Sequence, residues 1–213
     1  SETVLQADRL IFNSQNVLFA EGNVKVFQGT QRLYADRLYF DRISQDVQVE
    51  NIKEYFDGNS TSVSGDFGDL NLRMRNGIIQ AANIVIDQKI KIRSKEVTIE
   101  NGEVEAAAGI WRATSCEECE GEDPLWHLTA KSAVRNEERT QVVYKNVKLK
   151  FRGLPIAYTP YLRVPDPRIK RATGFLAPTL LVSSKLHTGI RLPYFLTLGS
   201  DKDVTLVPLV SPA

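Results

Sequence analysis

The residues of this chain whose type and spacing could do chemistry are two cysteines, Cys116 and Cys119, in a C-x-x-C arrangement. A reactive pair of this kind needs a positive environment or a helix N-terminus, because the thiolate is the form that reacts. Five acidic residues between positions 117 and 123 would disfavour the thiolate. A zinc site is also disfavoured, since His127 is the only third ligand nearby. In an oxidising compartment the pattern favours a disulfide, either between these two cysteines or with cysteines outside this chain.

The rest of the sequence offers no catalytic pattern. It has two histidines, and no Gly-x-Ser-x-Gly motif, phosphate-binding loop or metal-spaced carboxylate cluster occurs. The 27 Lys and Arg residues nearly balance the 26 Asp and Glu residues, so no overall field attracts nucleic acid. We therefore expect a protein that is not an enzyme, holds no metal or cofactor and binds no nucleic acid.

The elements that must position any site are predicted to be β-strands. Apolar residues alternate with polar ones over short runs, as in half-buried strands, and no helical pattern stands out. The segment from Ala7 to Phe12 (ADRLIF) returns as Ala35 to Phe40 (ADRLYF), 28 positions later, and looser echoes begin at Ser94 and Ala130. The recurrence indicates one supersecondary unit of about two strands that is stacked several times.

Turn signals built on glycine separate the predicted strands. They are Glu21-Gly22-Asn23, Gln28-Gly29, Asp57-Gly58-Asn59, Gly65-Asp66, Asn76-Gly77 and Asn101-Gly102. Together with the alternation they predict an all-β fold.

One face of each predicted strand is apolar and the other is polar. The candidates for the inward, apolar face are Leu10, Phe12, Val24, Val26, Leu38, Phe40, Ile84, Ile86, Ile90, Ile92, Val97 and Ile99. Such a stack can fill its interior with its own side chains or leave an apolar trough, and the sequence leaves both open. A register error of one residue would invert every assignment.

The charge balance changes after residue 144. Eight Lys and Arg residues lie between positions 145 and 171 against a single acid, Asp166, which makes a local net charge of +7. This positive stretch is either a solvated strand face or a cationic collar that meets lipid phosphates. Five prolines between positions 155 and 178 predict a stiff, irregular connector, because proline cannot donate to a sheet.

Alternation resumes beyond residue 178. Between His187 and Leu198, apolar side chains occupy every second position from Ile190 onward, opposite a face with arginine and histidine. This is typical of a lipid-exposed barrel strand, and the edge of a soluble sandwich produces it as well. No apolar run is long enough for a transmembrane helix. The strands are too few to close a barrel and no signal peptide is present, so we expect the N-terminal part of a longer, processed protein.

Several motifs together resemble one known family. They are Gly153 to Leu162 (GLPIAYTPYL), Pro165-Asp166-Pro167, Lys170 to Pro178 (KRATGFLAP), Ala35 to Leu38 (ADRL) and Gly22-Asn23-Val24. This succession is similar to the lipopolysaccharide-assembly outer-membrane proteins, the LptD or OstA-like family, from the periplasmic domain to its junction with the barrel. Pro178 and Pro193 match the family's two prolines in the first two barrel strands.

The resemblance implies three parts. Residues 1–152 would form a repetitive β-jellyroll, or β-taco, residues 153–173 a proline-rich connector, and residues 174–213 the first strands of a truncated outer-membrane β-barrel. The implied function is lipopolysaccharide transport and insertion into the outer leaflet. Acyl chains would pass along the twelve inward candidates to a lateral gate at Pro178 and Pro193, where missing backbone hydrogen bonds weaken the seam.

The resemblance also implies partners and a location. These are lipopolysaccharide, an LptA-like periplasmic jellyroll bridge protein, an LptE-like outer-membrane lipoprotein plug, and the outer membrane of a Gram-negative bacterium with the N-terminal domain in the periplasm. Disulfides through Cys116 and Cys119 would tie the periplasmic domain to the barrel. The alternative is a soluble periplasmic lipopolysaccharide-bridging or structural β-solenoid protein without a barrel.

Overall fold

A computed structural model describes most of the chain. The described residues are 3–13, 16–86, 90–114, 126–136, 141–166, 171–176, 179–183, 187–191, 193–199 and 201–210. Every regular element within these ranges is a β-strand, which confirms the predicted all-β class, and no helix there could cross a membrane. The strands are β1 (Thr3–Gln6), β2 (Arg9–Phe12), β3 (Val17–Gln28), β4 (Gln31–Asp41), β5 (Asp46–Phe56), β6 (Thr61–Asn71), β7 (Gly77–Ile86), β8 (Ile90–Glu100), β9 (Glu103–Thr114), β10 (Trp126–Asn136), β11 (Gln141–Phe151), β12 (Leu154–Pro165), β13 (Gly174–Phe175), β14 (Thr179–Ser183), β15 (His187–Arg191), β16 (Tyr194–Leu198), β17 (Lys202–Leu206) and β18 (Leu209–Val210).

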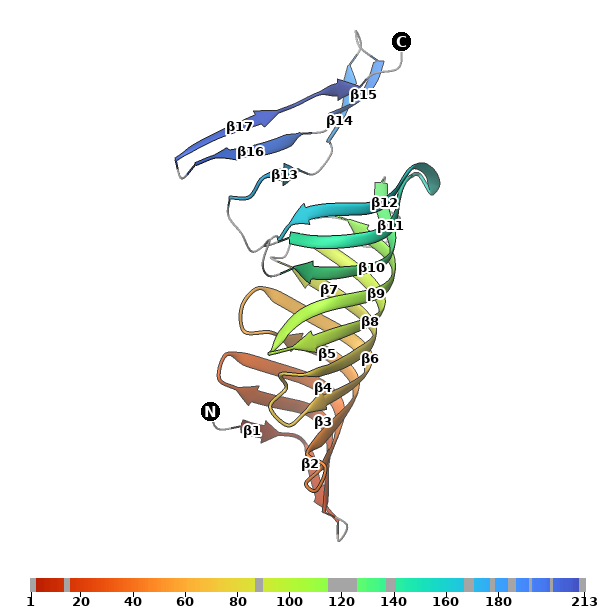
Figure 1. Cartoon of the computed structure of the whole chain (residues 1–213). Helices are drawn as coiled ribbons and strands as arrows, with labels where there is room; N and C mark the ends of the chain where they lie inside the picture. The colour runs from red at the N-terminus through yellow and green to blue at the C-terminus, as the bar shows by residue number, and fades with distance from the viewer. Residues whose placement is uncertain are drawn as a thin grey trace. The chain divides into compact units, whose positions relative to one another are not determined.

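The chain divides into two compact units. Unit 1 comprises Ser1–Val134 and Tyr144–Tyr161, and unit 2 comprises Arg135–Val143 and Leu162–Ala213. The strands β1 to β12 belong to one antiparallel sheet, in which β1 and β2 both pair with β3 and every later strand pairs with the next one along the chain. Figure 1 shows these strands stacked in chain order from β3 to β12.

Most of the predicted turns join neighbouring strands. In the β8–β9 turn, Asn101 and Gly102 both have positive φ angles, 53° and 88°, as a type I′ hairpin requires. Two predicted turns are wrong, because Gly22-Asn23 lies inside β3 and Gly65-Asp66 lies inside β6. Gly65 does not form a turn. It leaves space for the side chain of Ile79, since a Cβ atom at position 65 would lie 2.5 Å from Cγ2 of Ile79.

Alternate long strands carry a residue in the left-handed region near their middle. These residues are Asn23 in β3, Asn51 in β5, Ala81 in β7, Gly109 in β9 and Asn146 in β11, with φ angles between 46° and 64°. The pairing register slips beside them, for example between Glu21 and Val24 and between Arg93 and Glu96. Such bulges bend a strand and increase its twist. We call the five residues the bend row, because the sheet bends along them.

The 28-residue repeat seen in the sequence equals the spacing of the first two residues of the bend row, Asn23 and Asn51. The Asn23 side-chain amide donates to the carboxylate of Asp8 at 2.8 Å, and the Asn51 amide donates in the same way to Asp36. Lys53 Nζ also lies 3.1 Å from Asp36 Oδ2. The pKa of Asp36 is lowered, chiefly by the Lys53 hydrogen bond and then by Asn51. Each Asp-Asn pair therefore ties a bulge to the segment beside it, which is the bend between β1 and β2 for Asp8 and the strand β4 for Asp36.

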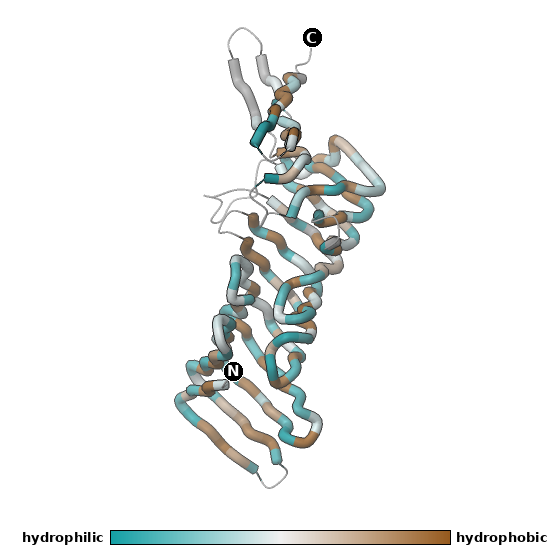
Figure 2. The backbone as a smooth tube through the Cα atoms, turned by 60° about the vertical axis from the view of Figure 1, so that its left-hand side comes forward, coloured by the Kyte–Doolittle hydropathy of each residue, from teal (hydrophilic) through white to brown (hydrophobic). Residues whose placement is uncertain are grey.

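The core of unit 1 lies on one face of the bent sheet. In β5, for example, buried positions alternate with exposed or half-buried ones on either side of the bend. Figure 2 shows the same alternation of hydrophobic and hydrophilic residues along the strands. The largest side chains that are completely buried are Tyr55, Leu33, Ile52, Leu70, Met74, Ile79, Ile84, Ile99, Val24, Val49, Val63 and Val97.

Unit 2 carries two small antiparallel sheets, β13-β16-β17 and β14-β15-β18. The single strand predicted from His187 to Leu198 is wrong, because β15 and β16 are separate strands in different sheets. Pro193 lies between them and has no N–H to donate to a ladder. Its carbonyl instead accepts a hydrogen bond from the amide of Leu176 at 2.9 Å.

Candidate functional site

The side chains that could do chemistry do not gather into a site among the described residues. No group of three or more His, Cys, Asp or Glu side chains that could hold a metal ion occurs among the described residues. Cys116, Cys119 and Pro178 lie outside them, so the disulfide and the lateral gate stay predictions. His127 is buried in β10. What the described residues do form is an apolar interior.

The structure places most of the twelve inward candidates in or beside this interior. Buried to within 5 % exposure are Val24, Val26, Leu38, Ile84, Ile92, Val97 and Ile99. Half-buried are Phe40, Ile86 and Ile90. Whether any of them contacts lipid stays a prediction.

Leu10 and Phe12 differ from the other candidates, because they are 52 % and 56 % exposed. Both lie in β2, which pairs with β3 alone, so no further strand shelters them. The guanidinium of Arg42 lies 5.6 Å from the centre of the Phe12 ring and covers part of it. The burial expected for these two positions from alternation is therefore wrong.

Several central residues escape a prediction from alternation, because the bulges change the parity of the strands. In β5 the buried residues Val49 and Ile52 flank Asn51, two positions before it and one position after it. The same spacing recurs in three more strands, as the pairs Ile79/Ala82 in β7, Ala107/Ile110 in β9 and Tyr144/Val147 in β11. A strict period of two cannot continue through such a position. The repeated asparagines at 23 and 51 are the signal that could have revealed it.

Hydrogen bonds close the interior across the sheet. In an antiparallel sheet of this order, Gln31 and Tyr55 lie at one side and the turns that contain Met74 and Gly102 lie at the other. Yet Gln31 Nε2 donates to the carbonyl of Gly102 at 3.2 Å and lies 3.2 Å from the Tyr55 hydroxyl. That hydroxyl donates to the carbonyl of Met74 at 2.9 Å, with the Gly102 carbonyl 3.1 Å away. We call Gln31, Tyr55, Met74 and Gly102 the clasp.

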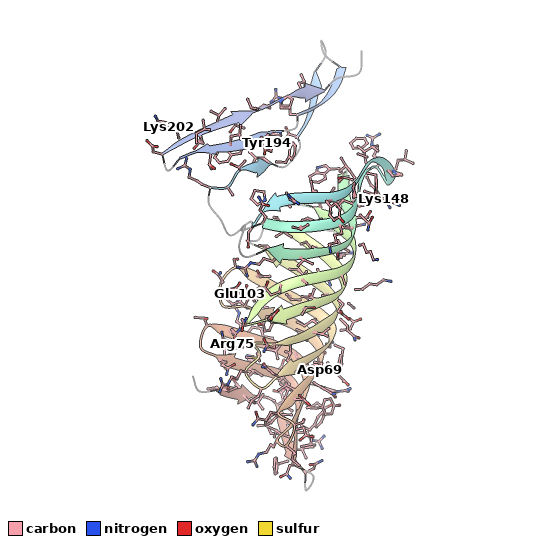
Figure 3. The ribbon with its side chains drawn as sticks, in the orientation of Figure 1. Asp69, Arg75, Glu103, Lys148, Tyr194 and Lys202 are labelled. Atoms are coloured by element: carbon pink, nitrogen blue, oxygen red, sulfur yellow. The ribbon has the colours of Figure 1, made fainter. Side chains whose placement is uncertain are left out.

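The clasp shows that the bent sheet folds over until its two sides meet. A further main-chain bond joins two of its turns, from the Gly102 amide to the carbonyl of Arg75 at 2.6 Å; Figure 3 labels Arg75 at this side of the sheet. Tyr55 has no exposed surface, and burial raises its pKa well above the usual range. The hydroxyl therefore stays protonated and remains a donor.

The interior behind the clasp is filled by side chains of the chain itself. Leu33, Val49, Val63 and Ile79 have no exposed surface. Close packing needs glycine on β6, because a Cβ atom at Gly68 would lie 2.6 Å from Cδ1 of Ile52. Of the two arrangements that the sequence leaves open, the structure shows the packed one at this level of the sheet.

The fold and this interior define a class of protein: an all-β chain whose long antiparallel sheet bends around an apolar interior and closes upon it. Several proteins named LPS-assembly protein LptD are similar to the chain over nearly its whole length. LPS-assembly protein LptD of Hahella chejuensis is 28 % identical over 218 residues, which cover 96 % of this chain and 25 % of that protein. LptD of Bordetella avium is 27 % identical over 204 residues, covering 95 % of this chain and 25 % of that protein. These similarities confirm the resemblance inferred from the sequence motifs.

The chain spans about a quarter of the length of these curated relatives. No protein-family model matches it. Among solved structures, the crystal structure of LptH, the LptA homologous periplasmic component of the lipopolysaccharide transport device of Pseudomonas aeruginosa, has a TM-score of 0.39 and 14 % identity, covering 58 % of this chain and 89 % of LptH.

Proposed function

We propose that this chain is the N-terminal, lipid-conducting part of a lipopolysaccharide-assembly protein, with a transport role and no catalytic one. The observation that carries the proposal is the continuous series of buried apolar side chains on one face of the bent sheet, from Val24 in β3 to Val147 in β11. The similarity to LptD proteins over 96 % of the chain supports it.

The physical advantage of such an interior is that it keeps hydrocarbon away from water. Each methylene group of an acyl chain that becomes exposed costs about 0.8 kcal/mol. An apolar track that is continuous from strand to strand avoids this cost at every step of the transfer. No covalent bond of the lipid forms or breaks along the proposed route. The energy for directional movement therefore comes from outside this chain.

Because the interior is packed in this structure, a guest acyl chain has to exchange places with side-chain contacts. Replacing one apolar contact by another changes little in burial, whereas the hydrogen bonds of the clasp must part if the two sides of the sheet separate. Each such bond contributes about 1 kcal/mol net. The clasp at Gln31, Tyr55, Met74 and Gly102 is therefore where the proposed route opens.

The proposed route has a beginning and an end. Lipopolysaccharide arrives from an LptA-like bridge protein at residues 1–152 and passes residues 153–173, of which Leu154–Pro165 form the regular strand β12, so that the irregular structure predicted for this connector is wrong there. It leaves at a lateral gate beside Pro178 and Pro193, in a barrel that starts in residues 174–213 and holds an LptE-like plug. The protein resides in the outer membrane with this part in the periplasm. The break between β15 and β16 at Pro193 supports a weak seam there.

Site-specific photo-crosslinking in cells that make lipopolysaccharide tests the proposal. A small diazirine amino acid replaces Val49, Ile84 or Ile92, which are buried in the interior. The matched controls carry the same probe at the adjacent residues Gln48, Asn83 and Arg93, which are exposed and belong to the opposite face. We expect lipopolysaccharide adducts from the interior probes and only background from the controls. Equal yields on both faces, or adducts from the controls alone, would reject an interior route.

A further inference from the structure

Two Asn-Gly sequences lie in the turns on one side of the clasp. They are Asn76-Gly77, where β7 begins, and Asn101-Gly102 in the β8–β9 turn. Glycine has no side chain to shield its backbone nitrogen, so this nitrogen can approach the side-chain carbonyl of the asparagine before it. Both asparagines are exposed to water. The turns therefore hold the two reactants of a deamidation at each site.

The reaction needs no enzyme and no cofactor. The glycine nitrogen attacks Cγ of the asparagine and forms a new C–N bond, while the side-chain nitrogen leaves as ammonia together with the proton of the glycine N–H. The product is a five-membered succinimide ring. Water then opens this ring at one of its two carbonyl carbons, which gives aspartate or isoaspartate. Isoaspartate adds one carbon atom to the main chain.

At Asn101 the closed clasp restrains the attacking nitrogen. The Gly102 amide donates to the carbonyl of Arg75 at 2.6 Å, so its N–H is already engaged. The carbonyl of Gly102 accepts from Gln31 at 3.2 Å and lies 3.1 Å from the Tyr55 hydroxyl. Attack on the Asn101 side chain requires this peptide group to turn and its proton to leave. The bond to Arg75 must therefore break first.

At Asn76 the same contacts restrain the carbonyl that is attacked. Its Oδ1 accepts a hydrogen bond from the backbone amide of Asn101 at 2.9 Å. This bond holds the side chain toward the β8–β9 turn and opposes the rotation that brings Cγ to the Gly77 nitrogen. Arg75, which Figure 3 labels, adds a second link between the turns, from Nη2 to the Asn101 carbonyl at 3.3 Å. Each turn thus restrains the reaction in the other.

We propose that Asn76 and Asn101 are sites of spontaneous deamidation whose rates are set by opening of the clasp. Local opening breaks the bonds between the two turns and frees the nitrogen at one site and the carbonyl at the other. Isoaspartate at position 101 would lengthen the main chain beside Gly102 and displace the carbonyl that Gln31 and Tyr55 contact. The inference goes beyond the proposed function, since thermal opening of the clasp does not require lipid.

Peptide mapping by mass spectrometry tests the inference on the purified chain, incubated at neutral pH without lipopolysaccharide. Synthetic peptides of residues 71–80 and 97–106 give the rates in the absence of the clasp. We expect both asparagines to react at least about tenfold more slowly in the folded chain than in the peptides, because only the opened fraction reacts. Tyr55→Phe should raise both rates in the folded chain at least about fivefold, since one hydrogen bond fewer must part.

The matched control variant is Tyr39→Phe, because Tyr39 is half-buried and pairs with exposed Gln48; both rates should stay unchanged. Asn146 is an internal reference, since Val147 follows it and shields the backbone nitrogen. The inference is overturned if the folded chain and the peptides react at equal rates, or if Tyr55→Phe leaves both rates unchanged. Equal acceleration at Asn146 would also overturn it, because the reaction would then follow global unfolding.

Discussion

At the scale of single residues, Tyr55 has the largest structural role of the described side chains. Its ring fills the interior with no exposed surface, and its hydroxyl connects Gln31 on one side of the sheet to the turns at Met74 and Gly102 on the other. A buried carbonyl that loses its donor costs more than the bond itself is worth. One hydroxyl group thus links the packing of the core to the closure of the sheet.

The substitution Tyr55→Phe should lower the free energy of unfolding by about 2 kcal/mol, since the ring remains while the buried Met74 carbonyl loses its donor. Urea unfolding followed by circular dichroism measures this change. Tyr161→Phe serves as the control, because Tyr161 is 62 % exposed, and it should leave the free energy of unfolding nearly unchanged. Equal effects of the two substitutions would show that the clasp adds nothing to stability.

Residue alternation predicted much of the interior, and its failures have physical causes. Val97 and Ile99 are buried as expected, because β8 keeps a period of two along that segment. Leu10 and Phe12 are likewise two positions apart but lie in a strand with a single partner, and residue spacing does not reveal how many neighbours a strand has. Tyr55 was not anticipated, since it lies three positions after Ile52 across a register slip.

At the scale of strands, the bend row decides the shape of each element. Asn51 adopts a φ angle of 55°, and its amide holds Asp36 in the neighbouring strand. Asparagine tolerates the left-handed region better than other residues with a side chain, and β-branched residues tolerate it least. The asparagines at positions 23 and 51 are therefore conformational requirements of the bend.

The substitution Asn51→Val should lower the free energy of unfolding by about 2 kcal/mol, because valine resists a positive φ angle and cannot bond Asp36. Asn51→Gly should cost clearly less, since glycine accepts the backbone conformation. The midpoint and slope of urea unfolding measure both changes. Gln48→Val in the same strand is the control, as Gln48 is exposed in regular β-structure and valine favours strands. If Asn51→Val and Asn51→Gly lowered the free energy of unfolding equally, the positive φ angle at position 51 would not be what selects asparagine.

A proline can end a β-strand at a point where the hydrophobic pattern continues unchanged. Apolar residues alternate from Ile190 to Leu198, yet β15 ends at Arg191 and β16 begins at Tyr194. The pattern describes which side chains share a face, whereas the ladder depends on amide donors, and Pro193 has none. The pattern therefore predicts strand content here and the proline predicts where the strand divides.

At the scale of the whole molecule, each unit has its own organisation. In the sheet of β1 to β12, a strand pairs with its immediate neighbours, so stability adds up along the sheet much as in a repeat protein. The clasp is the exception, because it joins Gln31 to Gly102 across 71 positions of sequence. Strands near the clasp should therefore be the most stable, and the short strands β1 and β2 the least.

Hydrogen exchange followed by mass spectrometry checks this gradient. We expect rapid exchange in β1 and β2, which are short and mostly exposed, and slow exchange in β5 to β7, which hold Tyr55, Val63 and Ile79 without exposed surface. The variant Tyr55→Phe should speed exchange at the Gly102 amide before it affects β1. Uniform protection along the sheet would mean that the chain unfolds as one cooperative unit instead.

The amino-acid sequence by itself determined the all-β class, the 28-residue repeat and most of the apolar positions, because alternation and turn chemistry are local properties of neighbouring residues. The tertiary structure decided which parity lies inside on each side of a bulge, that Leu10 and Phe12 stay exposed, and that the interior is packed and closed by the clasp. A bulge changes the inward face without changing composition. Hydrogen bonds between residues as distant as Gln31 and Gly102 leave no local pattern, because they exist only once the sheet has bent.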